Sequence, residues 1–244
     1  MEVYLGIDIG SVSTNIAVLA ESGAVIETIY LRTRGQPVEA VQQGLRQIRQ
    51  THPSLVVKRV GTTGSGRQMI GVVIGADSIK NEITAHAVAA MHIVPEVQTV
   101  LEMGGQDSKL ITIRGGVVTD FAMNTVCAAG TGSFLDQQSS RLGIPIDQFG
   151  DMAIRSCSPV RIAGRCAVFA ESDMIHKQQA GHSVSDILHG LCQALVRNYM
   201  SNVGKGKEIL EPVLFQGGVA ANKGMRRAFE EVLGLPVVIP PTMM

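Results

Sequence analysis

The sequence predicts an α/β protein built from two similar lobes that face each other across a cleft. Strands that end in glycine-rich turns recur along the 244 residues, and helical periodicity follows each group of strands. Hydrophobic residues make up 45% of the chain and charged residues 17%, so it can bury one large core or two smaller ones. Cationic and anionic residues number 21 each and Trp is absent, which argues against nucleic acid and anionic membranes as partners.

The first half begins with three strand patterns and one helix pattern. The strands are expected at residues 3–10, 15–20 and 24–33, where β-favouring side chains lie between Gly and Ser turns. Together they predict an antiparallel meander. Residues 37–52 carry apolar side chains at a three-four-three spacing, with Pro37 near the first turn, which predicts an amphipathic helix. A fourth strand, VVKRVGTTGSG, then runs into a glycine-rich loop.

The second half repeats the pattern of strands that end in paired glycines. These strands are expected in TVLEMGG, in SKLITIRGGVVTDFAMN with a hairpin turn at RGG, and in PVLFQGG. Residues 78–95 predict a connecting helix, and residues 186–203 a long, mostly buried helix. We therefore expect a first lobe at 1–80, a connecting helix at 81–96 and a second lobe at 97–244.

Three glycine-rich loops follow strands, and such loops can bind phosphate through backbone N–H groups. The candidate residues are Asp8, Gly10, Ser11, Ser13 and Thr14 in the first loop, Gly104, Gly105, Gln106, Asp107 and Lys109 in the second, and Gly217, Gly218 and Asn222 in the third. Asp8 ends a strand, where a carboxylate can hold Mg²⁺ through water. Each loop taken singly is also compatible with an ordinary turn.

The three loops together resemble the nucleotide-binding loops of the actin, Hsp70 and sugar kinase superfamily, whose two ribonuclease-H-like lobes bind ATP between them. The motifs GIDIGSVST, GGQDSK, MNTVCAAGTGSFLD, GRCAVFAESDMIHKQQ and GGVAAN are similar to one group within it. That group contains the activators (archerases) of 2-hydroxyacyl-CoA dehydratases and the ATPase subunits of benzoyl-CoA reductases. The stretch 190–224 is most similar to the ATPase modules of long CoA-enzyme activases and double-cubane cluster reductases.

Cys127 and Cys166 each lead into a helical pattern that a glycine ends, Gly143 in one case and Gly181 in the other. This predicts two helix N-termini, where the helix macrodipole favours negative charge. A [4Fe-4S] cluster needs four thiolates, but the chain offers two such positions. The resemblance implies a homodimer that shares one cluster, to which each subunit contributes Cys127 and Cys166.

Cys192 and the histidines are interpreted as structural or surface residues, whereas Cys157 is left unassigned. Cys192 lies within an apolar helix pattern, and Cys157 has no helical pattern behind it. The chain goes from Met1 directly into a strand pattern without a leader, and its cysteines are widely and irregularly spaced. We therefore expect reduced thiols and a cytoplasmic location.

The resemblance implies an ATPase that works as a one-electron donor. Ferredoxin or flavodoxin would reduce the cluster, Mg²⁺ and ATP would move the lobes, and hydrolysis to ADP would reset the dimer. The acceptor would be a 2-hydroxyacyl-CoA dehydratase or a benzoyl-CoA-reductase-like enzyme. Asp8 would organise Mg²⁺, and Gln106 or Asp107 would orient the attacking water.

Two other function classes stay open at this point. A small-molecule kinase of the N-acetylhexosamine type shares the fold, and Asp107 would then be the carboxylate base. A regulatory ATP-binding module of a larger protein is the third possibility. The last residues, VVIPPTMM, stop where the family usually continues into a closing helix, which is therefore expected to be absent.

Overall fold

The computed structural model describes residues 1–124 and 128–241. The chain divides into two compact units, Met1–Val88 and Ala89–Met244. The division falls inside helix α3 (Glu82–Ile93), within the segment expected to connect the two lobes. Each unit contains one five-stranded sheet.

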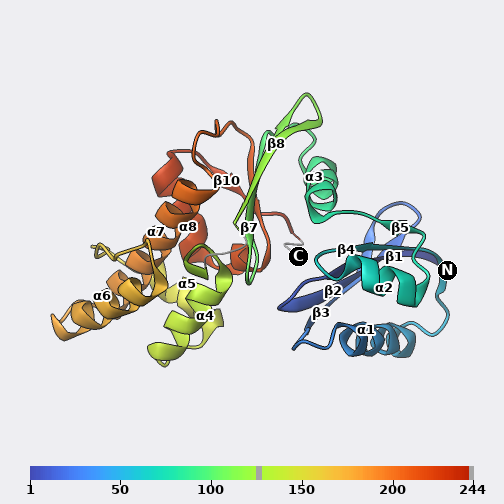
Figure 1. Ribbon diagram of the computed structural model, residues 1–244, viewed down its shortest axis with the longest axis horizontal. Helices are drawn as coiled ribbons and strands as arrows, with labels where there is room; N and C mark the ends of the chain where they lie inside the picture. The colour runs from blue at the N-terminus through green and yellow to red at the C-terminus, as the bar shows by residue number, and fades with distance from the viewer. Residues whose placement is uncertain (125–127, 242–244) are drawn as a thin grey trace. The chain divides into compact units, whose positions relative to one another are not determined.

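The sheet of the first unit has the order β3-β2-β1-β4-β5 (Figure 1). Its strands are β1 (Glu2–Ile9), β2 (Ser13–Ala20), β3 (Val25–Arg32), β4 (Val56–Thr63) and β5 (Ser78–Ile79). The first three strands pair antiparallel, whereas β1, β4 and β5 pair parallel. The predicted meander is therefore confirmed.

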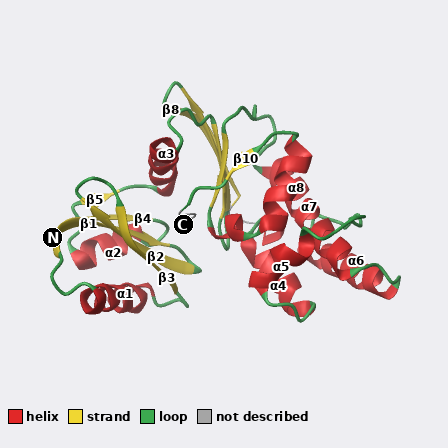
Figure 2. Ribbon diagram, turned by 180° about the vertical axis from the view of Figure 1, so that it is seen from behind, coloured by secondary structure: helices red, strands yellow, loops and turns green. Residues whose placement is uncertain are grey.

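Helices α1 (Pro37–Thr51) and α2 (Arg67–Ile74) belong to the same unit (Figure 2). The predicted apolar stripe of α1 is confirmed, because Val41 and Ile48 are buried in one cluster with alternate residues of β1. A Cβ atom at Gly44 would lie 2.5 Å from Ile16 Cδ1, so the absence of a side chain lets α1 approach β2 closely.

The second unit repeats the strand order of the first. Its strands are β6 (Thr99–Met103), β7 (Ser108–Arg114), β8 (Val117–Asn124), β9 (Val213–Gln216) and β10 (Val237–Val238). Their order, β10-β9-β6-β7-β8, matches β5-β4-β1-β2-β3 strand for strand, with the same parallel and antiparallel pairs. The predicted repeat of a meander in each half is confirmed.

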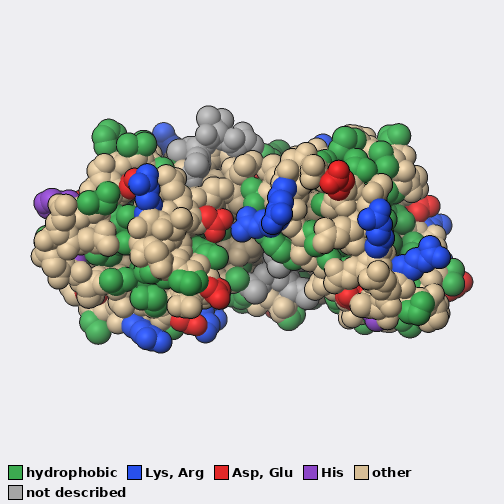
Figure 3. Space-filling model, turned by 90° about the horizontal axis from the view of Figure 1, so that it is seen from below, with side chains coloured by type: hydrophobic (Ala, Val, Ile, Leu, Met, Phe, Trp, Pro, Cys, Tyr) green, Lys and Arg blue, Asp and Glu red, His purple; other side chains and the backbone are tan. Residues whose placement is uncertain are grey.

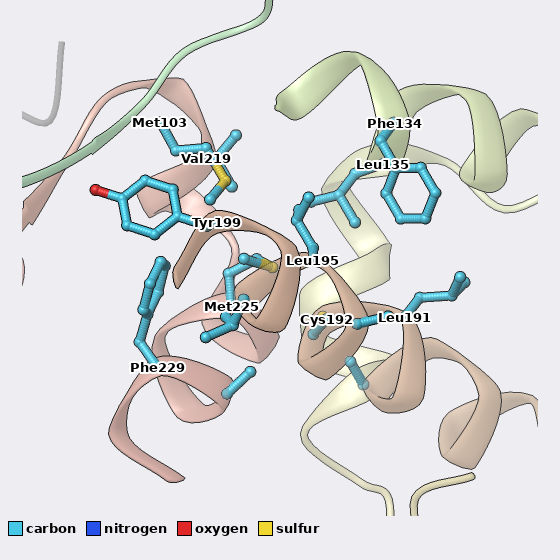
Figure 4. Close-up of a cluster of buried hydrophobic side chains, with 14 of the residues drawn as sticks. Met103, Phe134, Leu135, Leu191, Cys192, Leu195, Tyr199, Val219, Met225 and Phe229 are labelled. Carbon is cyan, nitrogen blue, oxygen red and sulfur yellow. The ribbon is translucent and has the colours of Figure 1, made fainter. Parts of the chain in front are cut away.

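The helices that follow β8 along the chain lie on one side of the sheet of the second unit (Figure 1). They are α4 (Gly132–Arg141), α5 (Ile146–Ala153), α6 (Ala167–Gln179), α7 (Val184–Asn202) and α8 (Lys223–Leu233). The prediction of a long buried helix is confirmed by α7. Figure 4 shows its side chains in a core whose labelled members are Met103, Phe134, Leu135, Leu191, Cys192, Leu195, Tyr199, Val219, Met225 and Phe229.

The expected glycine stops are present at the ends of α4 and α6. Gly143 has a φ of +66° and Gly181 a φ of +80°, the left-handed conformation that glycine adopts without steric cost. Ile144 donates to Ser139 O at 3.0 Å, and His182 donates to Lys177 O at 3.2 Å. Each helix thus ends in the six-to-one hydrogen bond of a Schellman motif.

Two predicted helix starts are wrong. The helix expected at 78–95 begins at Glu82, because β5 occupies Ser78–Ile79 and Asn81 Oδ1 accepts from Thr84 N at 2.8 Å as a cap. The small-residue turn expected after Cys127 is present as a 3-10 turn at Ala128–Gly130, so α4 begins only at Gly132 and not next to Cys127 as expected. Cys127 itself lies outside the described residues.

Along residues 1–124 and 128–241, no helix has both the length and the apolar character that a membrane crossing needs. On the face that Figure 3 shows, Lys and Arg side chains are interspersed with Asp and Glu side chains. This arrangement agrees with the balanced composition and leaves no single-sign field on that face.

We expect Asp186 to hold the start of α7 to the loop after α5 in a pH-dependent manner. Its carboxylate accepts from Ser183 Oγ at 2.6 Å, Ser156 Oγ at 2.7 Å and Ser158 N at 2.9 Å. These bonds, that of Ser183 first, lower the pKa of Asp186 from 3.8 to about 2. Because the folded-state pKa is depressed, the stabilisation is present above pH ~4 and is lost as the pH falls through the folded-state value.

Asp186→Asn should therefore lower the melting temperature at pH 7, and the difference from wild type should shrink as the pH approaches 2. Thermal unfolding followed by circular dichroism between pH 2 and 7 measures this difference. Asp147→Asn, which removes the same charge from the first turn of α5, controls for net charge. A constant gap between wild type and Asp186→Asn at all pH values would contradict the assignment.

Candidate functional site

The β1–β2 hairpin carries the first predicted loop. Gly10 N donates to Ser13 O at 2.8 Å, and a Cβ atom at Gly10 would lie 3.1 Å from the same oxygen, so the turn is tight. Ser11 is exposed and Ser13 half-buried. Thr14 is fully buried and its hydroxyl lies 3.0 Å from Thr33 Oγ1. The Thr14 side chain therefore supports the hairpin from inside instead of presenting its hydroxyl to a ligand.

Asp8, at the end of β1, is half-buried. It lies beside the loop after β4, which was not among the three predicted loops. A Cβ atom at Gly64 would lie 2.3 Å from Asp8 Oδ1, and Gly64 has a φ of +85°. Gly66 N donates to Ile9 O at 2.9 Å, and Ser65 Oγ donates to the same oxygen at 3.2 Å. The loop after β4 thus lies directly against the carboxylate predicted to hold Mg²⁺.

The β6–β7 hairpin carries the second predicted loop above a buried cluster of charges. Lys109 Nζ lies 2.9 Å from Glu102 Oε2 and 3.0 Å from Asp107 Oδ1. The Lys109 side chain is 2% exposed and that of Glu102 5%, whereas that of Asp107 is 34% exposed. Gln106 is exposed at the tip of the hairpin. The predicted phosphate ligand Lys109 is thus already held between two carboxylates.

Glu102 is a site residue that the glycine-rich motifs did not predict. Glu102 and Lys109 are directly paired across the two antiparallel strands. Directly paired residues point to the same face of a sheet, so a strand register read from the hairpin would have placed the two charges together. Each charge offsets part of the cost of burying the other.

The third predicted loop lies against the Glu102 carboxylate. Gly217 has a φ of +91°, and a Cβ atom there would lie 2.5 Å from Met103 O and 2.8 Å from Glu102 Oε1. A Cβ atom at Gly218 would meet nothing within 4 Å. Asn222 Oδ1 accepts from Met225 N at 3.2 Å and caps α8, so this amide oxygen has a structural role.

The N-terminus of α4 is bound to the second loop. Gly132 N donates to Gly104 O and Ser133 N to Gly105 O, both at 2.8 Å. A Cβ atom at Gly132 would lie 2.9 Å from both Gly104 O and Val219 Cγ2, so only glycine fits there without a shift. The segment that follows Cys127 is thereby attached to the hairpin predicted to bind phosphate.

Cys166 is the N-cap residue of α6, which confirms the predicted helix N-terminus. Its side chain is half-buried, and Val168 and Phe169 beside it are 68% and 67% exposed. Asp173, in the same helix, accepts from Ala163 N at 2.9 Å and so holds the segment before Cys166. Among the described residues, no group of three or more His, Cys, Asp and Glu side chains is arranged to hold a metal ion.

The other described cysteines differ from Cys166. Cys192 is fully buried in the core around α7, and burial raises the pKa of its thiol, as expected for a structural cysteine. Cys157 is exposed, and its Sγ lies 3.7 Å from Arg155 O. His189 is buried with its Nε2 2.8 Å from Glu231 Oε2, which agrees with its interpretation as a helix-lining residue.

Comparisons with known proteins agree with this arrangement. A sequence profile of the BadF/BadG/BcrA/BcrD ATPase family matches residues 5–243. The (R)-2-hydroxyglutaryl-CoA dehydratase activating ATPase of Acidaminococcus fermentans is 32% identical over 246 residues, covering 99% of this chain and 92% of that protein.

Two solved structures are similar over nearly the whole chain. The crystal structure of (R)-2-hydroxyglutaryl-CoA dehydratase component A from Acidaminococcus fermentans has a TM-score of 0.90 and 30% identity, covering 99% of this chain and 92% of that one. The activator of 2-hydroxyisocaproyl-CoA dehydratase from Clostridium difficile, with bound ADPNP, has a TM-score of 0.88 and 27% identity, covering 99% and 89%. The predicted actin-like fold with two ribonuclease-H-like halves is confirmed.

We expect breaking the Glu102–Lys109 pair to cost much more stability than breaking an exposed ion pair. Lys109→Met removes the cation that faces the buried Glu102 carboxylate, and breaking a buried ion pair in this way typically costs about 3–5 kcal/mol of unfolding free energy. Lys223 forms an ion pair of similar length, 2.7 Å to Asp151 Oδ1, but is 67% exposed. Lys223→Met should therefore change the unfolding free energy by about 0–1 kcal/mol.

Urea unfolding of the two lysine variants measures both changes. The double variant Glu102→Gln with Lys109→Met should recover part of the loss, because it removes both buried charges. Equal losses for Lys109→Met and Lys223→Met would show that the buried cluster is not the source of the stabilisation.

Proposed function

Because this chain belongs to the BadF/BadG/BcrA/BcrD ATPase family, we propose that it hydrolyses ATP to drive one-electron transfer to a 2-hydroxyacyl-CoA dehydratase or a related reductase. One observation supports this coupling above the others. The hairpin at Gly104 and Gly105 accepts two backbone hydrogen bonds from the start of α4, the helix that follows Cys127. A conformational change of the hairpin on nucleotide binding would therefore be transmitted to the start of α4, which follows this cysteine.

The nucleotide phosphates would be bound by glycine-rich turns in each unit. In the first unit the proposed ligands are the backbone of Gly10 and the hydroxyls of Ser11 and Ser13, with Asp8 holding Mg²⁺ through water. In the second unit they are the backbones of Gly104, Gly105, Gly217 and Gly218. Backbone N–H groups suit phosphate because they donate hydrogen bonds without a side chain in the way.

Hydrolysis would depend on positioning and charge neutralisation, since phosphoryl transfer leaves little covalent work for the protein. Gln106, exposed at the hairpin tip, or Asp107, partly exposed beside it, would orient the attacking water. Lys109 would act indirectly, because it holds Asp107 and Glu102 at 3.0 and 2.9 Å. Thr14 and Asn222 would likewise keep their loops in shape rather than contact the nucleotide.

The donor chemistry of the cysteines fits an iron–sulfur cluster. Thiolates are the usual ligands of [4Fe-4S] clusters, and when bound such a cluster accepts and releases one electron. Cys166, at the positive end of α6 and half-buried, offers one ligand, and Cys127, outside the described residues, would offer the second. Four ligands then require two chains.

We place the homodimer contact next to Cys166. Val168 and Phe169 are two-thirds exposed there, although apolar side chains of this size are usually covered. Aromatic and aliphatic side chains are typical of the core of a protein interface. In an isologous dimer the same patch meets its own copy, so each cysteine segment would meet its counterpart on the two-fold axis.

The energy scale is compatible with this function. Moving a two-state protein from 1:99 to 99:1 takes about 5.5 kcal/mol. At about 2.3 kcal/mol per 100 mV, this corresponds to roughly 240 mV for one electron. A ferredoxin or flavodoxin could then reduce the cluster, and the cluster would pass the electron on at a lower potential than that of the donor. The proposed location is the cytoplasm, where thiols stay reduced.

The cluster is tested by anaerobic reconstitution and iron counting. Wild type should bind about four irons per dimer, as one cubane requires. Cys127→Ser and Cys166→Ser should each lose the cluster, whereas Cys157→Ser, which changes an exposed thiol outside the proposed ligand set, should keep it. Colourless wild-type protein with iron supplied would favour a kinase or a regulatory ATP-binding module. Full iron content in both ligand variants would rule out the shared site.

The nucleotide loop is tested by a pair of glycine substitutions. A Cβ atom would meet nothing within 4 Å at either Gly218 or Gly6, so the fold should tolerate alanine at both positions. If Gly218 contacts the nucleotide, Gly218→Ala should weaken ATP binding about tenfold, or about 1.4 kcal/mol, with an unchanged melting temperature. Gly6→Ala, in β1, should leave the affinity unchanged. Titration calorimetry measures both, and identical affinities would remove Gly218 from the site.

A further inference from the structure

We propose that Asn198 is the residue that positions the two cysteine-bearing segments relative to each other. The proposal rests on the function proposed above, because it assigns Cys127 and Cys166 to one cluster. Asn198 lies near the end of α7 and is 6% exposed. Its amide contacts the backbone before Cys166 and also lies against the turn after Cys127. It would not bind iron itself.

One stripe of α7 accommodates the segment that leads to Cys166. Gly190, Ala194 and Asn198 are four residues apart and therefore lie on one side of the helix. A Cβ atom at Gly190 would lie 2.1 Å from Val160 O, and one at Gly164 would lie 2.6 Å from Ala194 O. The segment runs along α7 at backbone contact distance, which only small residues permit.

Asn198 ends this stripe with hydrogen bonds. Its Nδ2 donates to Gly164 O at 2.7 Å and lies 3.4 Å from Arg165 O. The preceding residue, Arg197, donates from Nη2 to Ile162 O at 2.9 Å. These donors hold three carbonyls in the four residues before Cys166. The backbone that delivers the Cys166 thiol is therefore fixed by side chains of α7.

The same amide faces the other cysteine segment with its oxygen. A Cβ atom at Gly130 would lie 2.9 Å from Asn198 Oδ1, so the 3-10 turn after Cys127 lies directly against Asn198. Asn202 Nδ2 donates to Asn198 Oδ1 at 2.8 Å, which orients the amide with its nitrogen toward Gly164. One side chain thus lies between the residue three positions after Cys127 and the residue two positions before Cys166.

Tyr199, the residue after Asn198, connects α7 to the β6–β7 hairpin. Tyr199 Oη donates to Lys109 O at 2.6 Å. Burial, and then the Glu102 carboxylate, raise the pKa of Tyr199, so its hydroxyl stays protonated as a donor. Consecutive residues of α7 therefore hold the hairpin strand and both cysteine segments. This makes α7 the rigid element against which the turn at Ala128–Gly130 and the segment before Cys166 are positioned.

The test compares Asn198→Ala with Val196→Ala by hydrogen–deuterium exchange on the full chain before iron is added. Val196 is also fully buried in α7 but lies about 200° round the helix from Asn198, so it controls for general destabilisation. Asn198→Ala should raise exchange in 162–167 roughly fivefold, the factor that one lost hydrogen bond of about 1 kcal/mol gives, and should also raise it in 128–133, where the packing contact with Gly130 is lost. Val196→Ala should not single out these segments.

Asn198→Asp separates the two contacts of the side chain. It keeps the volume that faces Gly130 but replaces the donor to Gly164 O with an acceptor. Exchange should therefore rise in 162–167 and stay near wild type in 128–133. Faster exchange in only one segment of Asn198→Ala, or the same pattern in Val196→Ala, would overturn the proposal.

A second readout follows in reconstituted protein. Asn198→Ala should shift the midpoint potential and the electron paramagnetic resonance signal of the cluster, because hydrogen bonding and solvent exposure around the thiolates tune both. Val196→Ala at matched stability should leave them unchanged, and a shift common to both variants would argue against a positioning role. If wild type binds no iron, the proposed function fails, whereas the exchange experiment still decides whether Asn198 braces the segments.

Discussion

The second unit depends on a buried ion pair placed beneath its glycine turns. Lys109 and Glu102 face each other at the end of a hairpin, and both are almost fully buried. Gly217 can pass Glu102 only without a side chain, so the third loop is shaped around this carboxylate. An isolated charge in this position would be strongly destabilising, whereas a pair gives two loops one fixed support.

From this support, order extends through buried hydrogen bonds to backbone carbonyls rather than through exposed side chains. The start of α4 is bound to the hairpin by Gly132 N and Ser133 N, and the Tyr199 hydroxyl donates to Lys109 O in β7. Helix α7 is therefore in contact with β7, with the turn at Ala128–Gly130 and with the segment before Cys166. In a close-packed core such contacts transmit shifts rather than absorb them, because neighbouring groups have no free space to yield. This is the physical basis for proposing that nucleotide and redox chemistry are linked.

Local patterns were sufficient to predict much of the fold. The strands of both meanders, the helix α1, the long helix α7 and the glycine ends of α4 and α6 depend on periodicity and on turn residues that lie close together in the chain. The two wrong helix starts have a common cause. Both starts depend on contacts with other parts of the chain. Ser78 pairs with the parallel strand β4, and Gly132 N donates to the carbonyl of Gly104.

The sequence by itself determined which chemical groups the protein has and where along the chain they fall. It placed glycines at strand ends, a thiol at the start of α6 and a carboxylate at the end of β1. Only the tertiary structure decided which of these groups are available. Thr14 is occupied by Thr33, 19 residues away, and Asn198 reaches Gly164 across 34 residues. A hydrogen bond depends on distance in space, and residue spacing along the chain does not specify that distance for loops brought together by packing.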